Sequence, residues 1–175
     1  MTVERARQRA QLLDSATDGE LKQLRLGPPR AVLTEIRTYL IRRSEVMKTK
    51  NNPIQLLRFR QENLVALIVL GPTIDRGPTD QHFNFDSGAR LSFGLTLRVV
   101  DDGSRLVSFR YHYVLPAGGS PKYIRFDLND APHVDPLLEP RCHLHPGLDD
   151  ARIPFAPRHP IEVLDRIFFA LEKQG

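Results

Sequence analysis

The segment Arg125–His145 reads RFDLNDAPHVDPLLEPRCHLH and holds the densest group of residues that could do chemistry in this chain. It contains three of the six histidines, three aspartates and the single cysteine. Histidine transfers protons near neutral pH and is also a common metal ligand. In His143-Leu144-His145, an extended backbone would point both imidazole rings to one side of the chain. This spacing suits either an acid–base pair or part of a metal site.

A metal site would need a third ligand, for which the segment offers His133, Asp135 or Cys142. The spacing of these residues matches no standard zinc signature, so we expect no metal and no cofactor. Alternatively, the two rings only form hydrogen bonds with backbone groups of a loop. We assign catalytic acid–base roles to His143 and His145, together with His112 and Asp127, which precede them along the chain.

A predicted antiparallel meander leads into this segment. Apolar and polar residues alternate over 91–99 and again over 107–115, and the turn Asp101–Ser104 lies between the two runs. This strict period of two, interrupted by Asp-Gly, is typical of a β-hairpin. A second turn at 116–121 leads to a third strand, 123–128.

One face of the meander is expected to be polar, because the apolar side chains must share the other face. Its charged residues are Arg98, Arg110, His112, Arg125 and Asp127. A histidine among arginines suits phosphate binding and proton transfer, since arginine binds phosphate oxygens through two parallel hydrogen bonds. The alternative is an ordinary solvated sheet face, which is polar in most antiparallel sheets.

Two strand pairings set the neighbours on this face. Pairing Val99 with Val107 would put Thr96 opposite Arg110 and Gly94 opposite His112. Pairing Tyr113 with Ile124 would put His112 opposite Arg125 and Arg110 opposite Asp127. A slip of two residues would change the partners but would keep the same face.

Helices are expected before the meander. Apolar residues at helical spacing predict a helix over 3–13, and the capping box Thr17–Glu20 predicts a second short helix. A third helix carries Leu33, Ile36, Leu40 and Met47 on one side. Asn52-Pro53 predicts the start of another short helix. The apolar run Leu64–Leu70 could be a buried strand or the end of that helix, and its branched residues and terminal Gly-Pro favour the strand.

The remaining segments complete an α+β fold with N-terminal helices, an antiparallel β-meander, a Pro-rich loop and a C-terminal helix. Residues 71–89 are expected to form a loop, and 131–160, with seven prolines, are expected to be irregular. A last helix should begin at Pro160 and pack on one face of the meander. We divide the chain into a basic helical region, 1–70, and a sheet region, 71–175, within one compact unit.

The charge is unevenly distributed along the chain. The net charge is +4, but residues 1–60 carry +7 and residues 61–175 carry −3. A basic front half suggests attraction to nucleic acid or to an acidic protein, and we assign Arg42 and Arg43 as nucleic-acid-binding residues. A solvated helical face is the alternative. No apolar run approaches the roughly 18 to 20 residues of a membrane span. With one cysteine and no signal peptide, we expect a cytoplasmic protein without membrane contact.

Five short motifs resemble the TumE-type toxin family of bacterial toxin–antitoxin modules. They are Phe109–Tyr113, Arg125–Asp127, Asn129–His133, His143–His145 and Pro160–Leu164. The resemblance covers roughly residues 90–172. It implies an RNA- or DNA-directed toxic activity held in check by an antitoxin, and a phage-defence locus is one setting for such a module.

Two main functions follow from these patterns. The first is a ribonuclease-like effector in which the histidines act as acid and base, and in which Arg98, Arg110 and Arg125 bind the scissile phosphate. The second is a non-catalytic defence-complex subunit that holds nucleic acid or protein through its Arg-rich helices. A metal-dependent hydrolase is third. The expected partners are nucleic acid, RNA more than DNA, and a cognate antitoxin or defence-complex protein, and a homo-oligomer is an open alternative.

Overall fold

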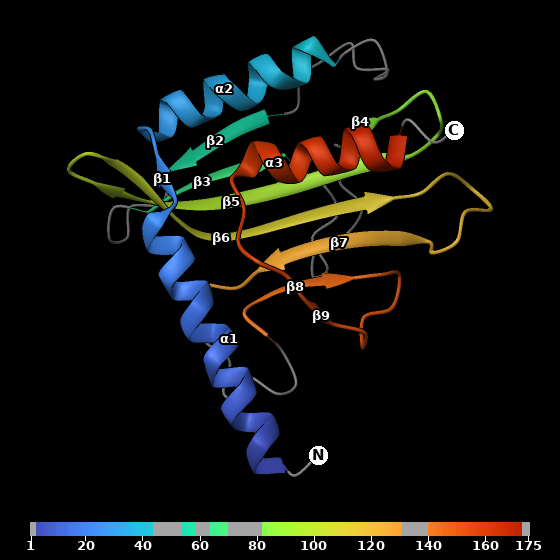
Figure 1. The fold of residues 1–175 in the computed structure, drawn as a ribbon. Helices are drawn as coiled ribbons and strands as arrows, with labels where there is room; N and C mark the ends of the chain where they lie inside the picture. The colour runs from blue at the N-terminus through green and yellow to red at the C-terminus, as the bar shows by residue number, and fades with distance from the viewer. Residues whose placement is uncertain (1–2, 44–53, 59–63, 70–81, 131–139, 173–175) are drawn as a thin grey trace.

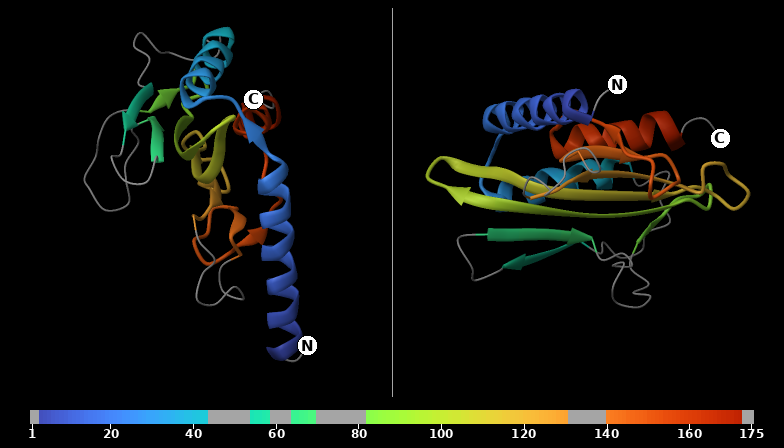
Figure 2. Two further views of the ribbon diagram at one scale, coloured as in Figure 1. Left: turned by 90° about the vertical axis from the view of Figure 1, so that its left-hand side faces the viewer. Right: turned by 90° about the horizontal axis from the view of Figure 1, so that it is seen from below.

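The computed structural model describes residues 3–43, 54–58, 64–69, 82–130 and 140–172. An antiparallel sheet of nine strands carries helices on one face (Figures 1 and 2). The helices are α1 (Val3–Gln23), α2 (Pro29–Arg42) and α3 (Pro160–Asp165), and a π-helical segment, Arg166–Glu172, continues α3. The predicted α+β class, with its antiparallel sheet and C-terminal helix, is confirmed.

Seven strands form the main path of the sheet. In spatial order they are β2 (Ile54–Arg58), β3 (Leu64–Val69), β5 (Arg90–Val100), β6 (Gly103–Val114), β7 (Tyr123–Leu128), β8 (Cys142–His145) and β9 (Ile153–Pro154). Two short strands lie off this path: β1 (Arg25–Leu26) pairs with β6, and β4 (Phe83–Asn84) pairs with β5. Because β3 pairs with β5, strands from both predicted regions lie in one sheet; the division at residue 70 stays a prediction.

The predicted pairing of the β5–β6 hairpin is wrong at its turn. Val99 lies opposite Ser104, not opposite Val107. The turn is tight because Gly103 adopts a φ of 147°, and a Cβ atom there would lie 2.4 Å from the carbonyl oxygen of Leu26 in β1. Glycine therefore permits both the turn and the close approach of β1.

A β-bulge further along this hairpin keeps the apolar side chains on one face. Thr96 pairs with Ser108 and Leu97 pairs with Leu106, so that Val107 is the extra residue of β6. Leu97 and Leu106 are both buried. A bulge places two residues of one strand opposite one residue of its partner and thereby changes the register.

Arg110 and His112 consequently have different partners on β5 from those predicted. Arg110 lies opposite Gly94 and His112 lies opposite Ser92. The β6–β7 pairing, in contrast, is confirmed: His112 lies opposite Arg125, and Arg110 lies opposite Asp127.

Two predicted helix starts are wrong. The capping-box residues Thr17–Glu20 lie inside α1, which is continuous to Gln23, because extending a helix is easier than nucleating a new one. The residues after Asn52-Pro53 form β2, because pairing with β3 overrides a local capping signal. The strand predicted for Leu64–Leu70 is confirmed as β3. Of the third predicted helix, Met47 lies outside the described residues.

Two segments predicted to be irregular contain strands. The end of segment 71–89 forms β4, although 71–81 lie outside the described residues. The segment 131–160 contributes β8 and β9, and 131–139 lie outside the described part. The prolines do not prevent these strands: Pro140 and Pro146 flank β8, and Pro154 lies in β9, the last strand of the main path, where proline is tolerated.

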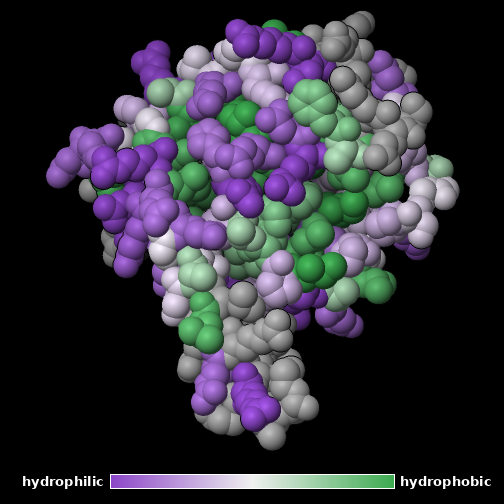
Figure 3. Space-filling model, viewed as in Figure 1, coloured by the Kyte–Doolittle hydropathy of each residue, from purple (hydrophilic) through white to green (hydrophobic). Residues whose placement is uncertain are grey.

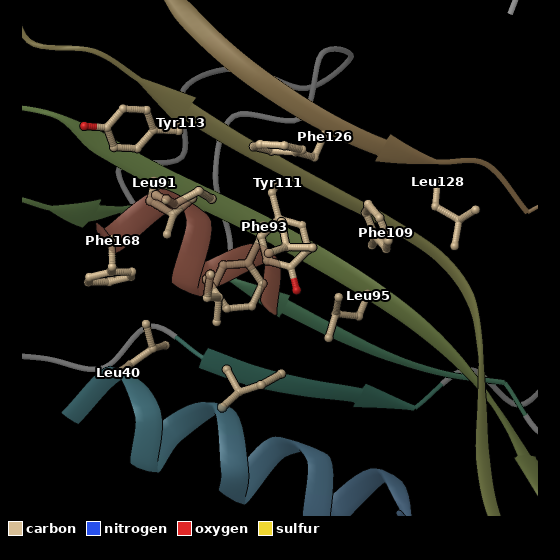
Figure 4. Packing of buried hydrophobic residues seen from close by; sticks show 14 of the residues in the cluster. Leu40, Leu91, Phe93, Leu95, Phe109, Tyr111, Tyr113, Phe126, Leu128 and Phe168 are labelled. Atoms are coloured by element: carbon tan, nitrogen blue, oxygen red, sulfur yellow. The ribbon is translucent and has the colours of Figure 1, made fainter. Parts of the chain in front are cut away.

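The core lies between the sheet and the helices and consists mainly of leucine and aromatic side chains (Figure 4). The rings of Phe93 and Tyr111 stack with centroids 5.1 Å apart, and Phe85 meets Phe168 of the C-terminal helical segment at 5.2 Å. The hydroxyl of Tyr111 donates a hydrogen bond to the carbonyl oxygen of Pro160 at 3.1 Å. This bond fixes the first turn of α3 against β6, and burial raises the pKa of Tyr111.

Helices α2 and α3 also contact each other. In α2, Val32, Ile36 and Leu40 enter the core, and the Tyr39 hydroxyl donates to Asp165 of α3 at 2.7 Å. Figure 3 shows this helix-bearing face, with hydrophilic residues over its upper left and apolar residues nearer its middle and right. Among the described helices, none has the length and apolar character that crossing a membrane requires.

Candidate functional site

The residues predicted to do chemistry meet on β7 and β8, on the sheet face away from the helices. Asp127 lies opposite His143, and Arg125 lies opposite His145. Their neighbours Phe126, Leu128 and Cys142 point to the core, so the alternation of a strand directs the chemical residues to the other face. His143-Leu144-His145, which lies in the segment predicted to be irregular, pairs with β7 as β8 and extends the sheet itself.

Asp127, His143 and His145 form a compact group, which we call the Asp–His cluster. The Nε2 atoms of the two histidines are 2.9 Å apart. The Oδ2 atom of Asp127 lies 3.4 Å from Nε2 of His145 and 3.7 Å from Nε2 of His143. All three side chains are at most 3% exposed. The cluster is therefore buried, not presented on an open surface.

Two arginines contact the carboxylate of Asp127. Nε of Arg125 donates to Oδ2 at 2.7 Å, and Nε of Arg110 donates to Oδ1 at 3.0 Å. Arg125 also places its NH2 nitrogen 2.8 Å from Nε2 of His145. The Arg125 side chain is 12% exposed and that of Arg110 is 51% exposed. Arg110 is thus the positive group of this site that solvent reaches most easily.

Asp149 forms an outer partner for Arg125. The carboxylate accepts from NH1 of Arg125 at 2.9 Å and from the hydroxyl of Tyr123 at 2.6 Å. The bond from Tyr123, followed by the charge of Arg125, lowers the pKa of Asp149. The Arg125 guanidinium therefore lies between an exposed carboxylate and a buried one.

His112 lies beside the cluster, on the strand that precedes it. Its ring meets the ring of Tyr123 edge-on with centroids 5.1 Å apart. Its Nε2 atom is buried and has no hydrogen-bond partner among the residues that the structure describes. Burial, and then the nearby charge of Arg125, lower the pKa of His112. The neutral ring is therefore favoured at neutral pH.

The other predicted phosphate-binding residues lie apart from the cluster. Arg98 is exposed on the same face of the sheet, but it is four residues along β5 from Gly94, the partner of Arg110. That separation is about 13 Å at the usual rise per residue. Arg42 and Arg43 lie at the end of α2, on the opposite side of the sheet, where Arg43 lies over the ring of Phe169 at 4.3 Å.

None of the residues that the sequence offered as a third metal ligand is found in the described part of the cluster. Cys142 points into the core, and burial raises the pKa of its thiol to about 12. His133 and Asp135 lie outside the described residues. Asp127, which was predicted as a catalytic residue but not as a ligand, is the third member of the cluster.

Nδ1 of His143 and Nδ1 of His145 lie at hydrogen-bond distance from the carbonyl oxygens of Pro140 and Leu148, contacts of the kind that the backbone-bonding alternative predicted. Sequence reasoning missed Asp149. The available signal was Pro146-Gly147 directly after His145, which is typical of a turn. Gly147 adopts a φ of 81°, and a Cβ atom there would lie 2.4 Å from Cβ of Pro121. This turn returns the chain beside β7 and brings Asp149 to Arg125.

No family model, curated protein or solved structure matched this chain. The site is therefore interpreted from its own geometry. Two imidazole nitrogens and a carboxylate oxygen of the Asp–His cluster lie close together, and the guanidinium of Arg125 contacts them. The guanidinium of Arg110 lies where solvent reaches the site. These groups could bind a cation inside the cluster and an anion at Arg110.

Proposed function

We propose that this chain is a nucleic-acid-directed effector with ribonuclease-like activity, and that its chemistry is centred on the Asp–His cluster and Arg110. The observation that supports this proposal is the position of Arg110: it bonds to Asp127 and is half exposed. A guanidinium at that boundary can bind a phosphate of a polynucleotide and stabilise developing charge on it.

The proposed setting follows from the sequence motifs. A cytoplasmic toxin of a toxin–antitoxin or phage-defence system would require a protein partner that holds it inactive. RNA is the preferred substrate class, because a flexible single strand could reach a recessed site more readily than a duplex. The burial of both histidine rings means that a substrate would contact Arg110 first.

The second candidate function is non-catalytic binding of nucleic acid or a protein partner. The burial of the cluster favours it, because neither histidine is exposed to a macromolecule. Arg42 is exposed at the end of α2 on the other side of the sheet. Binding through this side would depend on salt and would not depend on the cluster.

Cleavage and binding assays on labelled RNA and DNA strands distinguish the two functions. We expect Arg110→Ala to reduce cleavage by about a hundredfold, the effect typical of losing one charge-stabilising donor. The matched control is Arg105→Ala, which removes an exposed arginine from the same strand and should leave cleavage unchanged. Arg98→Ala tests whether the more distant arginine of this face contributes.

The non-catalytic function predicts a different pattern. Arg42→Ala and Arg43→Ala should weaken binding and should each reduce the slope of log affinity against log salt by about one. Arg110→Ala should then have no larger effect than Arg105→Ala. If the folded protein neither cleaves nor binds either polynucleotide, both functions are refuted.

A further inference from the structure

The three ligand atoms of the Asp–His cluster are spaced as ligands of one metal ion. They are Nε2 of His143, Nε2 of His145 and Oδ2 of Asp127, and their separations are 2.9, 3.4 and 3.7 Å. The point equidistant from the three atoms in their plane lies about 2.0 Å from each. Zinc lies about 2.0 to 2.2 Å from nitrogen and oxygen ligands, so one ion at or just above that point would contact all three.

The hydrogen bonds of the two rings leave their Nε2 atoms as the natural ligand atoms. Nδ1 of His143 lies 2.5 Å from the carbonyl oxygen of Pro140, and Nδ1 of His145 lies 3.3 Å from that of Leu148. A carbonyl oxygen can only accept, so each Nδ1 carries a proton. This arrangement, Nδ1–H to a carbonyl with Nε2 facing the ion, is how proteins orient metal-binding histidines.

Two Nε2 lone pairs that face each other at 2.9 Å repel unless a positive species lies at them. A proton shared between the rings would satisfy both atoms, and so would a metal ion. NH2 of Arg125 also lies 2.8 Å from Nε2 of His145, and because the guanidinium can only donate, it uses the lone pair of that atom. A positive charge at these nitrogen atoms therefore stabilises the cluster.

Arg125 contacts two of the three candidate ligand atoms. Its Nε bonds to Oδ2 of Asp127, and its NH2 bonds to Nε2 of His145. The positively charged guanidinium therefore bonds to acceptor atoms that a metal ion would also use. Asp149, which is 74% exposed, offers a second carboxylate toward which Arg125 can turn. Exchange of the guanidinium for a metal ion is thus possible without leaving the arginine unpaired.

We propose that Asp127, His143 and His145 bind one divalent transition-metal ion of the zinc class, in competition with the side chain of Arg125. Two histidines and one carboxylate are a recurrent ligand set for Zn²⁺ and non-haem Fe²⁺, and leave further positions for water or substrate. The proposal goes beyond the proposed function, because metal binding does not require that nucleic acid be the substrate.

Calorimetric titration of the tag-free, chelator-treated full chain with Zn²⁺ tests this site directly. We expect one ion per chain. His143→Gln should weaken binding by more than the roughly 10- to 100-fold that loss of a supporting group causes. His159→Gln is the matched control, because His159 caps α3 and lies outside the cluster; it should bind Zn²⁺ as the wild type does.

The competition with Arg125 provides a second test that does not depend on removing a ligand. Arg125→Met should bind Zn²⁺ about tenfold more tightly, which corresponds to about 1.4 kcal/mol. Co²⁺ bound to the wild type should show visible bands of nitrogen and oxygen ligation without a thiolate charge-transfer band, because Cys142 points into the core.

Three results would overturn the proposal: no stoichiometric Zn²⁺ binding, equal loss of binding in His143→Gln and His159→Gln, or undiminished binding in His143→Gln. The first of these would leave the guanidinium of Arg125 and a proton as the positive groups of the cluster. Metal binding without cleavage of RNA or DNA would refute only the proposed function. Cleavage that persists in a chelator, in protein that binds no metal, would refute only this inference.

Discussion

Replacing Asp127 with asparagine tests whether the buried carboxylate holds the candidate site together. The substitution keeps the size of the side chain but removes its charge. In the wild type this carboxylate accepts bonds from Arg125 and Arg110, and it is only 3% exposed. In the variant, Arg125 would keep its exposed partner Asp149 but would lose its buried one.

The expected loss in the free energy of unfolding follows from how exposed each arginine partner of Asp127 is. Arg125 is 12% exposed, and removing one member of a buried ion pair typically costs about 3 to 5 kcal/mol. Arg110 is 51% exposed, so its pair with Asp127 contributes only about 0.2 to 1 kcal/mol. We therefore expect Asp127→Asn to lower the free energy of unfolding by about 3 to 5 kcal/mol, with Arg125 as the main cause.

Urea unfolding followed by circular dichroism in the presence of a chelator measures this loss. The matched control is Asp102→Asn, because Asp102 pairs with Arg25 at 3.4 Å while both side chains are exposed; it should lose about 1 kcal/mol or less. Adding Arg125→Met to Asp127→Asn should restore part of the stability, because the arginine that has lost its buried carboxylate partner is then gone. A loss below about 1 kcal/mol for Asp127→Asn, at an unchanged denaturant slope, would refute the reasoning.

Three further predictions concern the core, pH and the thiol. Leu164→Ala should lower the free energy of unfolding by about 2 to 5 kcal/mol, because this side chain is fully buried; Leu12→Ala, at an exposed position, should change it by about 0.5 kcal/mol or less, and thermal or urea unfolding compares the two. Burial and the charge of Arg125 lower the pKa of His112, so the unfolded chain binds the extra proton and the stability that His112 contributes is lost as pH falls below about 6.5. His112→Asn should therefore lose less stability than the wild type between about pH 7.5 and pH 5.5, and equal losses would contradict this. The Cys142 thiol, whose pKa burial raises to about 12, should react with a thiol reagent at about pH 8 only after urea is added; rapid labelling of the folded chain would show that it is accessible.

The polar face of the meander could be predicted because it depends on local pattern. The period of two along β6 and β7 directs Arg110, His112, Arg125 and Asp127 to one side whatever the register. The β6–β7 pairing was also predicted, since one register aligns the apolar residues of both strands. The β5–β6 pairing was not predicted, because periodicity reveals neither the tight turn that pairs Val100 with Gly103 nor the extra residue at the Val107 bulge.

Local signals failed where pairing between distant segments decided the structure. The capping signal at Asn52-Pro53 predicted a helix, but the following residues pair with β3. The prolines of 131–160 predicted irregular chain, but Cys142–His145 completes the sheet beside β7. In each case the backbone groups form hydrogen bonds with another strand, and that gain depends on a partner that the local sequence does not specify.

The sequence by itself determined which residues could do chemistry and that His143 and His145 would point to the same side, because side-chain direction along a strand is a local property. Only the tertiary structure decided that these rings lie beside Asp127, that they are buried, and that Arg42 and Arg43 lie on the opposite side of the sheet. The physical reason is that β8 pairs with β7 while Cys142 enters the core, and this choice depends on the packing of the whole sheet.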